Sequence, residues 1–196
     1  MQITRQVGAD HEWYEPQRYW RPRTDQWGTT SIKTLAVAGD GAGIFGAEAA
    51  ALAGKLAALE TVHRAGKIDE LQRDVEAGPL MREHNRIAGV RPLLDRLYHP
   101  APEVLTPTDE TLVCRCEEVT AGDIRKCVEE GAIGPNQLKA YTRCGMGPCQ
   151  GRMCGLTVAE VIADAHGKTA EEIGYYRLRP PIKPVTLGEL AAMEDA

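Results

Sequence analysis

The chain lacks several features that would assign it to a class of protein at once. It has no run of basic residues, and 23 Lys and Arg against 28 Asp and Glu give a formal net charge of −5, which argues against a nucleic-acid partner. No stretch approaches the ~18 uncharged apolar residues of a membrane span. The N-terminal residues lack the apolar core of a signal peptide. We therefore expect no transmembrane segment and a cytoplasmic location, either free or held at the periphery of the inner membrane by partner proteins.

Cysteine, by contrast, is concentrated in a small part of the chain. The 196 residues are 43% hydrophobic, which is typical of a globular protein, and they include six cysteines. Five of the six lie in "VCRCEEVT" (113–120) and "RCGMGPCQGRMCG" (143–155). In a reducing compartment disulfides are rare, and grouped thiols more often bind metal or do redox work.

The composition and residue patterns of the sequence divide the chain into four segments. Residues 1–66 combine expected strands with a Gly-Asp motif and an Ala-rich helix, and residues 67–107 read as a helical connector followed by a Pro-rich linker. Residues 108–167 form the cysteine-rich module. Residues 168–196 contain prolines that a helix cannot run through, and are expected to be an extended tail.

The first segment is expected to be rich in strands. The stretch "QITRQV" alternates in polarity, "TLAVA" is a short apolar run, and the aromatic residues Trp13, Tyr14, Tyr19, Trp20 and Trp27 favour β-structure. From Gly46 to about Ala65 the small residues predict a helix that can lie close to a neighbour.

Three helices are expected in the cysteine-rich module. Thr120 and Asp123 resemble a capping box before a helix that contains Cys127 and stops near Gly131. Cys127 is therefore expected to be a packed core thiol. A second helix covers "PNQLKAY", and a third runs through "GLTVAEVIADAHG". The other five cysteines then lie on the loops that enter the first and third helices.

Loops at helix N-termini are suited to hold a metal centre. Unpaired N–H groups and the positive end of the helix dipole stabilise thiolates, and Gly145, Gly147 and Gly151 let the backbone approach sulfur. Structural zinc favours cysteines two to four residues apart, whereas two-iron clusters accept wider spacings. No histidine stands beside these cysteines, which excludes a Rieske centre. Spacing alone leaves both zinc and a 2Fe-2S cluster open.

The cysteine-rich module resembles a known family of iron-sulfur domains. "VCRCEEVTAGDIRKCVEEGA" followed by "QLKAYTRCGMGPCQGRMCG" is similar to the 2Fe-2S domain of the bacterioferritin-associated ferredoxin (BFD) type, in the version at the C-terminal end of FAD-dependent oxidoreductases. These enzymes include octopine and nopaline oxidases, D-hydroxyproline dehydrogenase and a hydrogen cyanide synthase subunit. The resemblance implies a 2Fe-2S cluster on Cys114, Cys116, Cys149 and Cys154.

A competing ligand set passes the same spacing rules. Cys144 and Cys149 stand at the same separation as Cys149 and Cys154, so Cys114, Cys116, Cys144 and Cys149 also fit. The family element places its thiols after "GMGP", which favours the first set. Cys144 would then be a neighbour packed beside the cluster.

The first segment carries a second resemblance. "TTSIKTLAVAGDGAGIFGAEAAALAG" looks like the second FAD motif of glutathione-reductase-type flavoproteins, in which a strand ends in Ala-x-Gly-Asp and leads into a helix. The resemblance implies that Asp40 binds a ribityl hydroxyl of FAD and that the loop residues Gly39, Gly41, Ala42 and Gly43 lie against the cofactor. The alternative is a simple strand–turn–helix corner.

The same glycines spell a dinucleotide motif that we reject. Gly41, Gly43 and Gly46 give G-x-G-x-x-G, but a separate Rossmann site also needs a second strand that ends in an acidic residue about 20 residues later. Glu60 stands at that distance and is expected to lie inside a helix.

Together the resemblances imply an α+β chain, with an N-terminal β-rich fragment that completes a flavin-binding domain and a mostly helical 2Fe-2S domain. The first FAD motif is missing, so the chain looks like the C-terminal part of a larger enzyme, encoded separately or cut off. FAD is then shared with a flavoprotein partner, and the substrate-oxidising subunit is expected to act on an amino-acid-derived C–N bond of an opine or of an imino or amino acid. The sequence assigns no catalytic residue. The alternative function is a non-enzymatic iron-sulfur or zinc adaptor that binds a protein partner.

Overall fold

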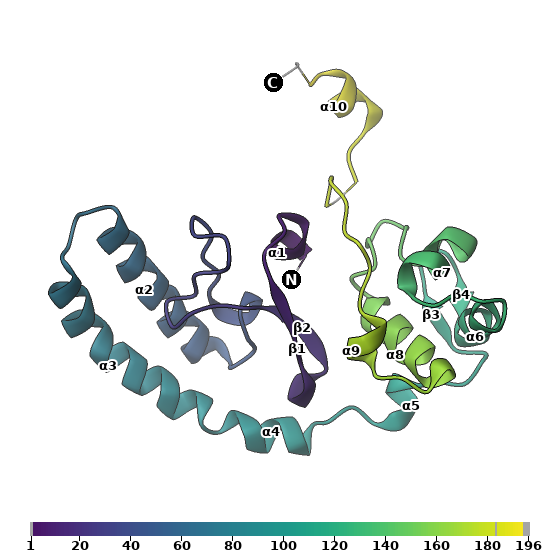
Figure 1. The fold of residues 1–196 in the computed structure, drawn as a ribbon, viewed down its shortest axis with the longest axis horizontal. Coiled ribbons are helices and arrows are strands. Elements are labelled where there is room, and N and C mark those ends of the chain that lie inside the picture. Colours follow the sequence, from purple (N-terminus) through teal and green to yellow (C-terminus); the bar gives the residue numbers. More distant parts are fainter. Residues whose placement is uncertain (1, 183, 194–196) are drawn as a thin grey trace. The chain divides into compact units, whose positions relative to one another are not determined.

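The computed structural model describes residues 2–182 and 184–193 and contains two compact units, Met1–His99 and Pro100–Ala196. Figure 1 shows helices as the main elements of both units, with one small antiparallel sheet in each. The expected α+β class is therefore confirmed for the described residues, with much more helix than strand.

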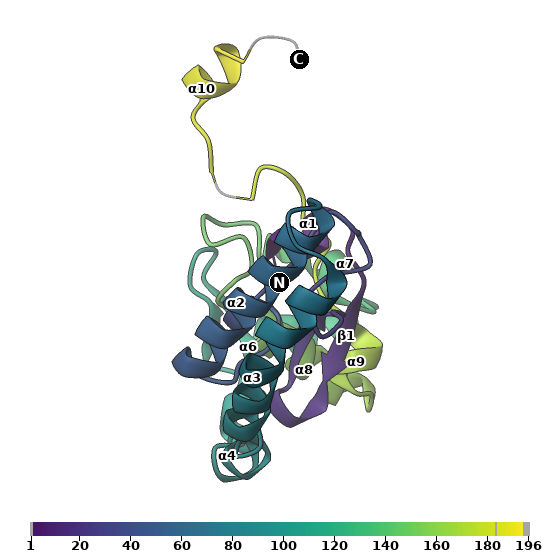
Figure 2. The ribbon, with the colours of Figure 1, turned by 90° about the vertical axis from the view of Figure 1, so that its left-hand side faces the viewer.

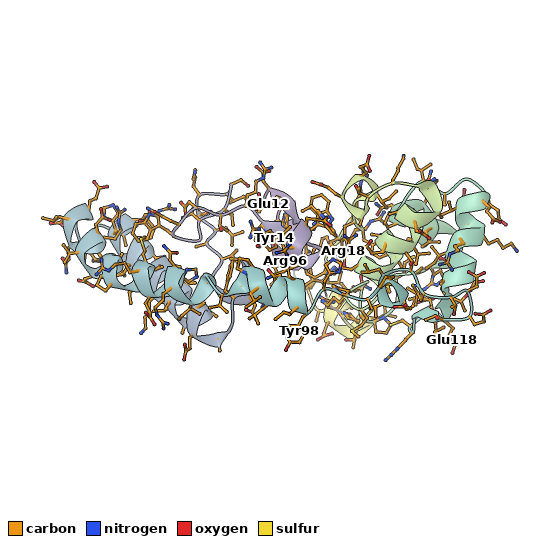
Figure 3. The ribbon with its side chains drawn as sticks, turned by 90° about the horizontal axis from the view of Figure 1, so that it is seen from below. Glu12, Tyr14, Arg18, Arg96, Tyr98 and Glu118 are labelled. Carbon is orange, nitrogen blue, oxygen red and sulfur yellow. The ribbon has the colours of Figure 1, made fainter. Side chains whose placement is uncertain are left out.

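The first unit begins with a short helix and a hairpin. Helix α1 (Gln2–Gln6) precedes strands β1 (His11–Tyr14) and β2 (Tyr19–Pro22), which the 3-10 helix η1 (Glu15–Gln17) joins. Two aromatic pairs face each other across the hairpin, Trp13 with Trp20 and Tyr14 with Tyr19. Arg21 donates from Nε to Oε1 of Glu12 at 2.8 Å, and Figure 3 labels Glu12 and Tyr14 on this hairpin. Cross-strand pairs of this kind stabilise a hairpin that has no third strand.

The prediction of a β-rich N-terminal fragment is wrong in two places. "QITRQV" forms α1, and "TLAVA" is no strand but contributes only the isolated bridge between Thr29 and Ala36. A strand needs a neighbour to accept its backbone hydrogen bonds, and the described residues offer "TLAVA" only the short stretch around Gly28 and Thr30. A helical turn forms its hydrogen bonds within its own stretch of chain, as the N–H of Val7 does with the carbonyl of Ile3, so α1 needs no neighbouring strand.

A helical pair supports the rest of the first unit. The 3-10 helix η2 (Gly39–Gly41) leads to α2 (Ala47–Arg64), and α3 (Glu70–Ala88) returns beside it before α4 (Arg91–Leu97). Figures 1 and 2 show α2 and α3 side by side. Their apolar contact is formed by buried Trp27, Leu56 and Ala77, with Leu59, Leu80 and Met81 against them. The predicted Ala-rich helix and the helical connector are confirmed.

A buried ion pair joins the two helices. Oε2 of Glu60 accepts from Arg73 at 2.9 Å, and Oε1 accepts from Arg64 at 2.7 Å. Burial opposes ionisation of Glu60, but the two arginines outweigh it, so the pKa of this carboxyl is lowered. Glu60 therefore lies inside a helix, as expected, and its carboxylate is paired with Arg64 and Arg73. It does not stand at the end of a strand, where a Rossmann site needs its acidic residue.

The second unit is built around one buried helix. Helix α8 (Gly155–His166) contacts α5 (Pro102–Leu105), α6 (Ala121–Glu129), α7 (Pro135–Thr142) and α9 (Ala170–Ile173). Its side chains Val158, Val161 and Ile162 are fully buried. Strands β3 (Leu112–Cys114) and β4 (Val119–Thr120) pair beside α6. The three helices expected in this module are confirmed, as are the capping box of Thr120 and Asp123 and the left-handed stop at Gly167.

The C-terminal segment is only partly extended. Helix α9 and helix α10 (Leu187–Ala191) both lie within the residues expected to form an extended tail, although the prolines of this segment stand outside both helices. Each helix begins at a capping box, formed by Thr169 with Glu172 and by Thr186 with Glu189. Tyr175 and Tyr176 are buried, so the beginning of the segment packs against the second unit.

Among the described residues, no helix is long and apolar enough to cross a bilayer.

Leu138 tests the core of the second unit. Its side chain is fully buried in α7, so Leu138→Ala should lower the free energy of unfolding by about 2–5 kcal/mol through lost burial and a residual cavity. Leu187→Ala is the matched control, because Leu187 is 85% exposed and the change should stay within about 0.5 kcal/mol. Urea denaturation followed by circular dichroism measures both. Equal effects of the two substitutions would contradict the assigned core.

Candidate metal centre and a cavity beside the Gly-Asp motif

Five cysteines meet where two loops approach the N-terminus of α8. Cys114 ends β3 and Cys116 follows in the turn toward β4, whereas Cys144 follows α7 and Cys154 is the residue before α8. Cys149 lies between these last two, on the glycine-rich loop. The tight path of the two loops requires left-handed backbone at Glu118, Arg143 and Gln150.

The sulfur atoms are close together and differ in exposure. Cys114, Cys144 and Cys154 are buried, and their Sγ atoms all lie within 4.8 Å of one another. Cys116 is exposed and Cys149 is half-buried, and the side chains of these two residues are joined by a hydrogen bond. The group of three buried sulfurs thus contains two ligands of the favoured set, Cys114 and Cys154, together with Cys144, while the other two, Cys116 and Cys149, contact each other. This arrangement does not choose between the two predicted ligand sets. Cys127 is buried within α6, as expected for a core thiol.

Backbone donors favour a thiolate at Cys149. Burial opposes its ionisation, but N–H groups of Met153, Gly151 and Arg152 and the thiol of Cys116 donate to its sulfur, so the pKa of Cys149 is lowered. The N–H of Cys149 lowers the pKa of Cys116. The hydrogen bond from Cys116 to the Cys149 sulfur and the charge of Cys149 act in the opposite direction, and the pKa of Cys116 is raised overall. Within this pair, Cys149 is therefore the thiol that ionises more readily.

The buried sulfurs cannot all ionise without a cation. The pKa of Cys154 is raised strongly by its hydrogen bond to Cys144, by burial and by repulsion from Cys144. Several thiolates in a low-dielectric site repel one another, and a bound metal cation reverses that balance. Grouped thiols, amide donors and a helix N-terminus are the chemistry that a thiolate-ligated metal centre needs. The residues present fit such a centre, and four thiolates serve zinc as well as a 2Fe-2S cluster.

Glycines give the loops room to approach one another. A Cβ at Gly147 would overlap the Cβ of Cys116 and lie 3.2 Å from Oε1 of Glu117. A Cβ at Gly145 would lie 2.6 Å from the ring of Tyr176, and one at Gly151 would lie 2.9 Å from it. The glycines that indicated close approach to sulfur thus also make room for the C-terminal segment.

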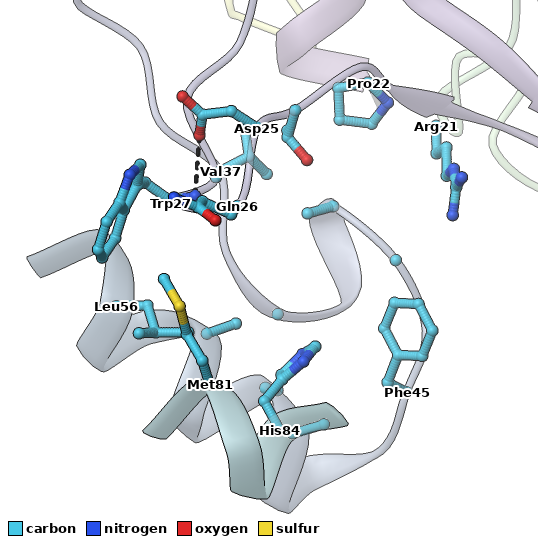
Figure 4. Close-up of a pocket in the computed structure, with 18 of the residues that line it drawn as sticks. Arg21, Pro22, Asp25, Gln26, Trp27, Val37, Phe45, Leu56, Met81 and His84 are labelled. Carbon is cyan, nitrogen blue, oxygen red and sulfur yellow. Dashed lines mark hydrogen bonds between the residues drawn. The ribbon is translucent and has the colours of Figure 1, made fainter. Parts of the chain in front are cut away.

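A cavity lies beside the Gly-Asp motif in the first unit. It measures about 320 Å³, near the lower end of the range of ligand pockets, ~300–1,000 Å³. Gly39, Ala42 and Gly43 line it, and Figure 4 shows Phe45, Met81 and His84 around it. Asp40 and Gly41 are exposed on η2 and are not among the described residues that line the cavity. The strand expected before Asp40 is absent, as described above.

Sequence reasoning missed the part of the lining that α3 contributes. Met81, His84 and Asn85 stand three and four residues apart and so share one helix face, which lines the cavity opposite the Gly-Asp loop. The ring of His84 meets that of Phe45 at a centroid distance of 5.9 Å. No short motif marks these residues, because only the packing of α3 on α2 brings them to the loop. Small residues Ala49, Ala50 and Ala53 of α2 form an apolar wall. The lining thus combines this apolar wall with the loop glycines and the imidazole of His84.

The helical fold of the second unit and its grouped thiols define a domain suited to hold a metal, and one family matches this region. Residues 108–194 match the family described as the sarcosine oxidase A3 domain.

The full chain is similar to components of multi-subunit oxidoreductases. It is 43% identical over 98% of its length to an opine oxidase subunit of Rhizobium meliloti (strain 1021), covering 42% of that protein. It is 35% identical over 94% of its length to hydrogen cyanide synthase subunit HcnB of Pseudomonas aeruginosa, covering 39% of it. The chain therefore spans about two fifths of the length of these relatives.

A solved structure shares the fold. The crystal structure of L-proline dehydrogenase from P. horikoshii matches with a TM-score of 0.69 and 23% identity, over 94% of this chain and 35% of that chain. At this level of identity the likeness concerns the fold alone.

Gly147 tests the close approach of the two cysteine loops. Because the clash is with a neighbouring Cβ and not with a flexible side-chain end, Gly147→Ala should push the 113–120 loop away and at least halve the metal bound per chain. Gly54→Ala is the matched control, since its added Cβ meets nothing within 4 Å and alanine favours the helix by ~1 kcal/mol. Elemental analysis of the purified variants gives the metal content. Full metal content in Gly147→Ala would show that the loops tolerate separation.

Proposed function

We propose that this chain is the electron-transfer part of an FAD-dependent oxidoreductase that oxidises an amino-acid-derived C–N bond, such as that of an opine or of an imino or amino acid. The observation that carries the proposal is the group of three buried thiols with Cys116 and Cys149 beside it at the N-terminus of α8. The similarity to the opine oxidase subunit of R. meliloti and to HcnB supports the class of reaction. The match to the sarcosine oxidase A3 domain supports it independently of those full-chain relatives.

The metal centre of this proposal is a BFD-like 2Fe-2S cluster held by Cys114, Cys116, Cys149 and Cys154. When bound, such a cluster accepts and passes on single electrons, which complements the two-electron chemistry of a flavin. The chain supplies the thiolates, the N–H donors of Gly151, Arg152 and Met153 to sulfur, and the burial of Cys114 and Cys154. Hydrogen bonds to sulfur and low solvent exposure are the features by which a protein tunes the reduction potential of a cluster.

The second ligand set, with Cys144 in place of Cys154, keeps one observation in its favour. Cys144 is as deeply buried as Cys114 and lies within the same group of sulfurs. The family element favours Cys154, whose position as the residue before α8 also places its sulfur at the positive end of a twelve-residue helix. We therefore assign Cys154 as the ligand and Cys144 as a packed neighbour.

The flavin part of the proposal assigns η2 and α2 to a shared FAD site. Asp40 would bind the ribityl chain, Gly39, Gly41, Ala42 and Gly43 would border the cofactor, and a flavoprotein partner would hold the adenosine diphosphate half. Because Asp40 is exposed, its carboxylate is accessible to a cofactor that lies partly on another chain. In this division residues 1–66 are the FAD-domain fragment, 67–107 the connector, 108–167 the 2Fe-2S domain and 168–196 the C-terminal segment. Substrate oxidation is assigned to a partner protein, and the complex to the cytoplasm.

The metal and its ligands are tested together. Anaerobically purified protein should be reddish brown, contain about two irons per chain and give an S = 1/2 signal after one-electron reduction. Cys149→Ser and Cys154→Ser should each strip or gravely weaken the cluster, because a ligand thiolate is lost, whereas Cys144→Ala should leave most of the iron. Iron analysis and electron paramagnetic resonance measure the outcome. A colourless protein with one zinc would contradict the cluster and favour the adaptor function. Iron lost in Cys144→Ala but kept in Cys154→Ser would favour the second ligand set, since Cys149 is a ligand in both sets.

The shared flavin site is tested by co-expression. The isolated chain should bind FAD weakly, because the described cavity holds only part of the cofactor, and the complex with a flavoprotein partner should bind it stoichiometrically. Asp40→Ala should lower flavin occupancy in the complex while the iron content stays unchanged. Flavin fluorescence after denaturation measures occupancy, with Asp10→Ala as the control on an exposed aspartate outside the cavity. Tight FAD binding by the isolated chain would contradict the shared site.

A further inference from the structure

The C-terminal segment 174–182 lies directly on the cysteine loop. The hydroxyl of Tyr175 donates to the carbonyl of Gly151 at 3.1 Å, and the hydroxyl of Tyr176 donates to Sγ of Cys144 at 3.4 Å. Arg152, between Cys149 and Cys154, donates to the carbonyl of Ile182. Three separate contacts therefore connect this segment to the loop that supplies the later cysteines.

A second set of contacts anchors the same segment to α7. The backbone N–H of Arg177 donates to Oδ1 of Asn136 at 2.9 Å, and Nζ of Lys139 donates to the carbonyl of Arg177 at 3.3 Å. The ammonium group of Lys139 also lies 5.4 Å from the ring centroid of Tyr176, a cation–π contact. The tyrosine is thus held between α7 and the loop.

The loop is shaped to receive the tyrosine ring. Gly145 and Gly151 both have positive φ, and a Cβ at either would come within 3 Å of Tyr176. The rings of Tyr175 and Tyr176 meet edge to face at 5.7 Å. The two glycines on either side of Cys149 in the sequence thus leave the space that the ring of Tyr176 fills. A tail that only covered the loop would not need this space.

We propose that segment 174–182 is a clasp that closes the cysteine centre, and that Tyr176 is a positioning residue that acts through Cys144. The O–H of Tyr176 orients the Cys144 sulfur, and that sulfur lies within 4.8 Å of those of Cys114 and Cys154. The fifth thiol thereby has a role that does not require it to be a ligand. The clasp proposal depends on the proposed function only in the experiment that measures metal retention. Segment 174–182 shields the thiols whether or not a metal is bound.

The chemistry of Tyr176 matches this role. A tyrosine phenol, with an ordinary pKa of about 10, is protonated at neutral pH and can donate through its O–H, as Tyr176 does to Sγ of Cys144. A neutral phenol next to a sulfur adds no negative charge to a crowded group of thiols. Phenylalanine would keep the ring contacts with Gly145 and Gly151 and remove only the donor.

The experiment is a double-mutant cycle on the full chain. Tyr176→Phe should speed the release of iron to a chelator about fivefold, the effect of one lost hydrogen bond. In a Cys144→Ala background the same substitution should change the rate by less than about twofold, because the partner of the hydroxyl is already absent. Tyr141→Phe is the matched control, since Tyr141 is 66% exposed on α7. Equal acceleration in both backgrounds, or none in either, would overturn the role of Tyr176 through Cys144.

A second readout is independent of the cluster. In metal-free chain, 5,5′-dithiobis(2-nitrobenzoate) should react slowly with the buried thiols of the wild type and of Tyr176→Phe, and much faster with those of Tyr176→Ala, which removes the ring. If the wild type holds zinc, the proposed cluster fails and the cycle is measured on zinc release. If Cys144→Ala itself loses the metal, the cycle is measured on thiol reactivity. Unchanged reactivity in Tyr176→Ala would overturn the clasp.

Discussion

The organisation of the second unit depends on the confinement of several sulfur atoms at the end of one buried helix. Cys114, Cys144 and Cys154 bring three thiols within 4.8 Å of one another, away from solvent, where like charges repel strongly. Only loops with little side-chain volume can approach so closely, which explains Gly147 beside Cys116, whereas Gly145 and Gly151 leave room for the ring of Tyr176. Helix α8 supplies the buried core and begins at the loop whose N–H groups are directed at sulfur, so the stability of the fold and the chemistry of the site depend on the same part of the chain.

The first unit places a cavity where a loop and two helices meet. The ion pairs of Glu60 with Arg64 and Arg73 and the buried contact of Leu56 with Ala77 hold α2 and α3 together. The small residues of α2 keep the cavity open, and α3 closes it with Met81 and His84. The proposal of a cofactor shared between chains rests on this cavity and on the exposed Asp40 beside it. The relatives, of which the chain spans about two fifths, are longer proteins.

The helices could be predicted because their signals are local. The capping box of Thr120 and Asp123, the proline that begins α7 and the left-handed glycine that ends α8 each act within a few residues. The strands could not be predicted in the same way, because a strand depends on a neighbour. "TLAVA" has the composition of a buried strand but finds only an isolated bridge among the described residues, and "QITRQV" folds into a helical turn. The prediction of an extended C-terminal tail was wrong in part because local signals were overlooked. The capping boxes at Thr169 and Thr186 begin two short helices, but the prolines of the segment favoured an extended chain.

The sequence by itself determined that Cys116, Cys144 and Cys149 lie outside helices and that Cys154 directly precedes one, because caps, helix stops and glycines are encoded in short stretches. Cys114, expected on the same loop as Cys116, is instead the last residue of β3. The sequence also determined that Cys127 packs inside a helix and that Glu60 cannot end a strand. Only the tertiary structure decided that Cys144 lies among the other buried sulfurs, that His84 faces the Gly-Asp loop and that Tyr176 reaches Cys144. These contacts join residues that lie far apart in the chain. Local propensities cannot predict such contacts, because the contacts follow from how whole helices pack.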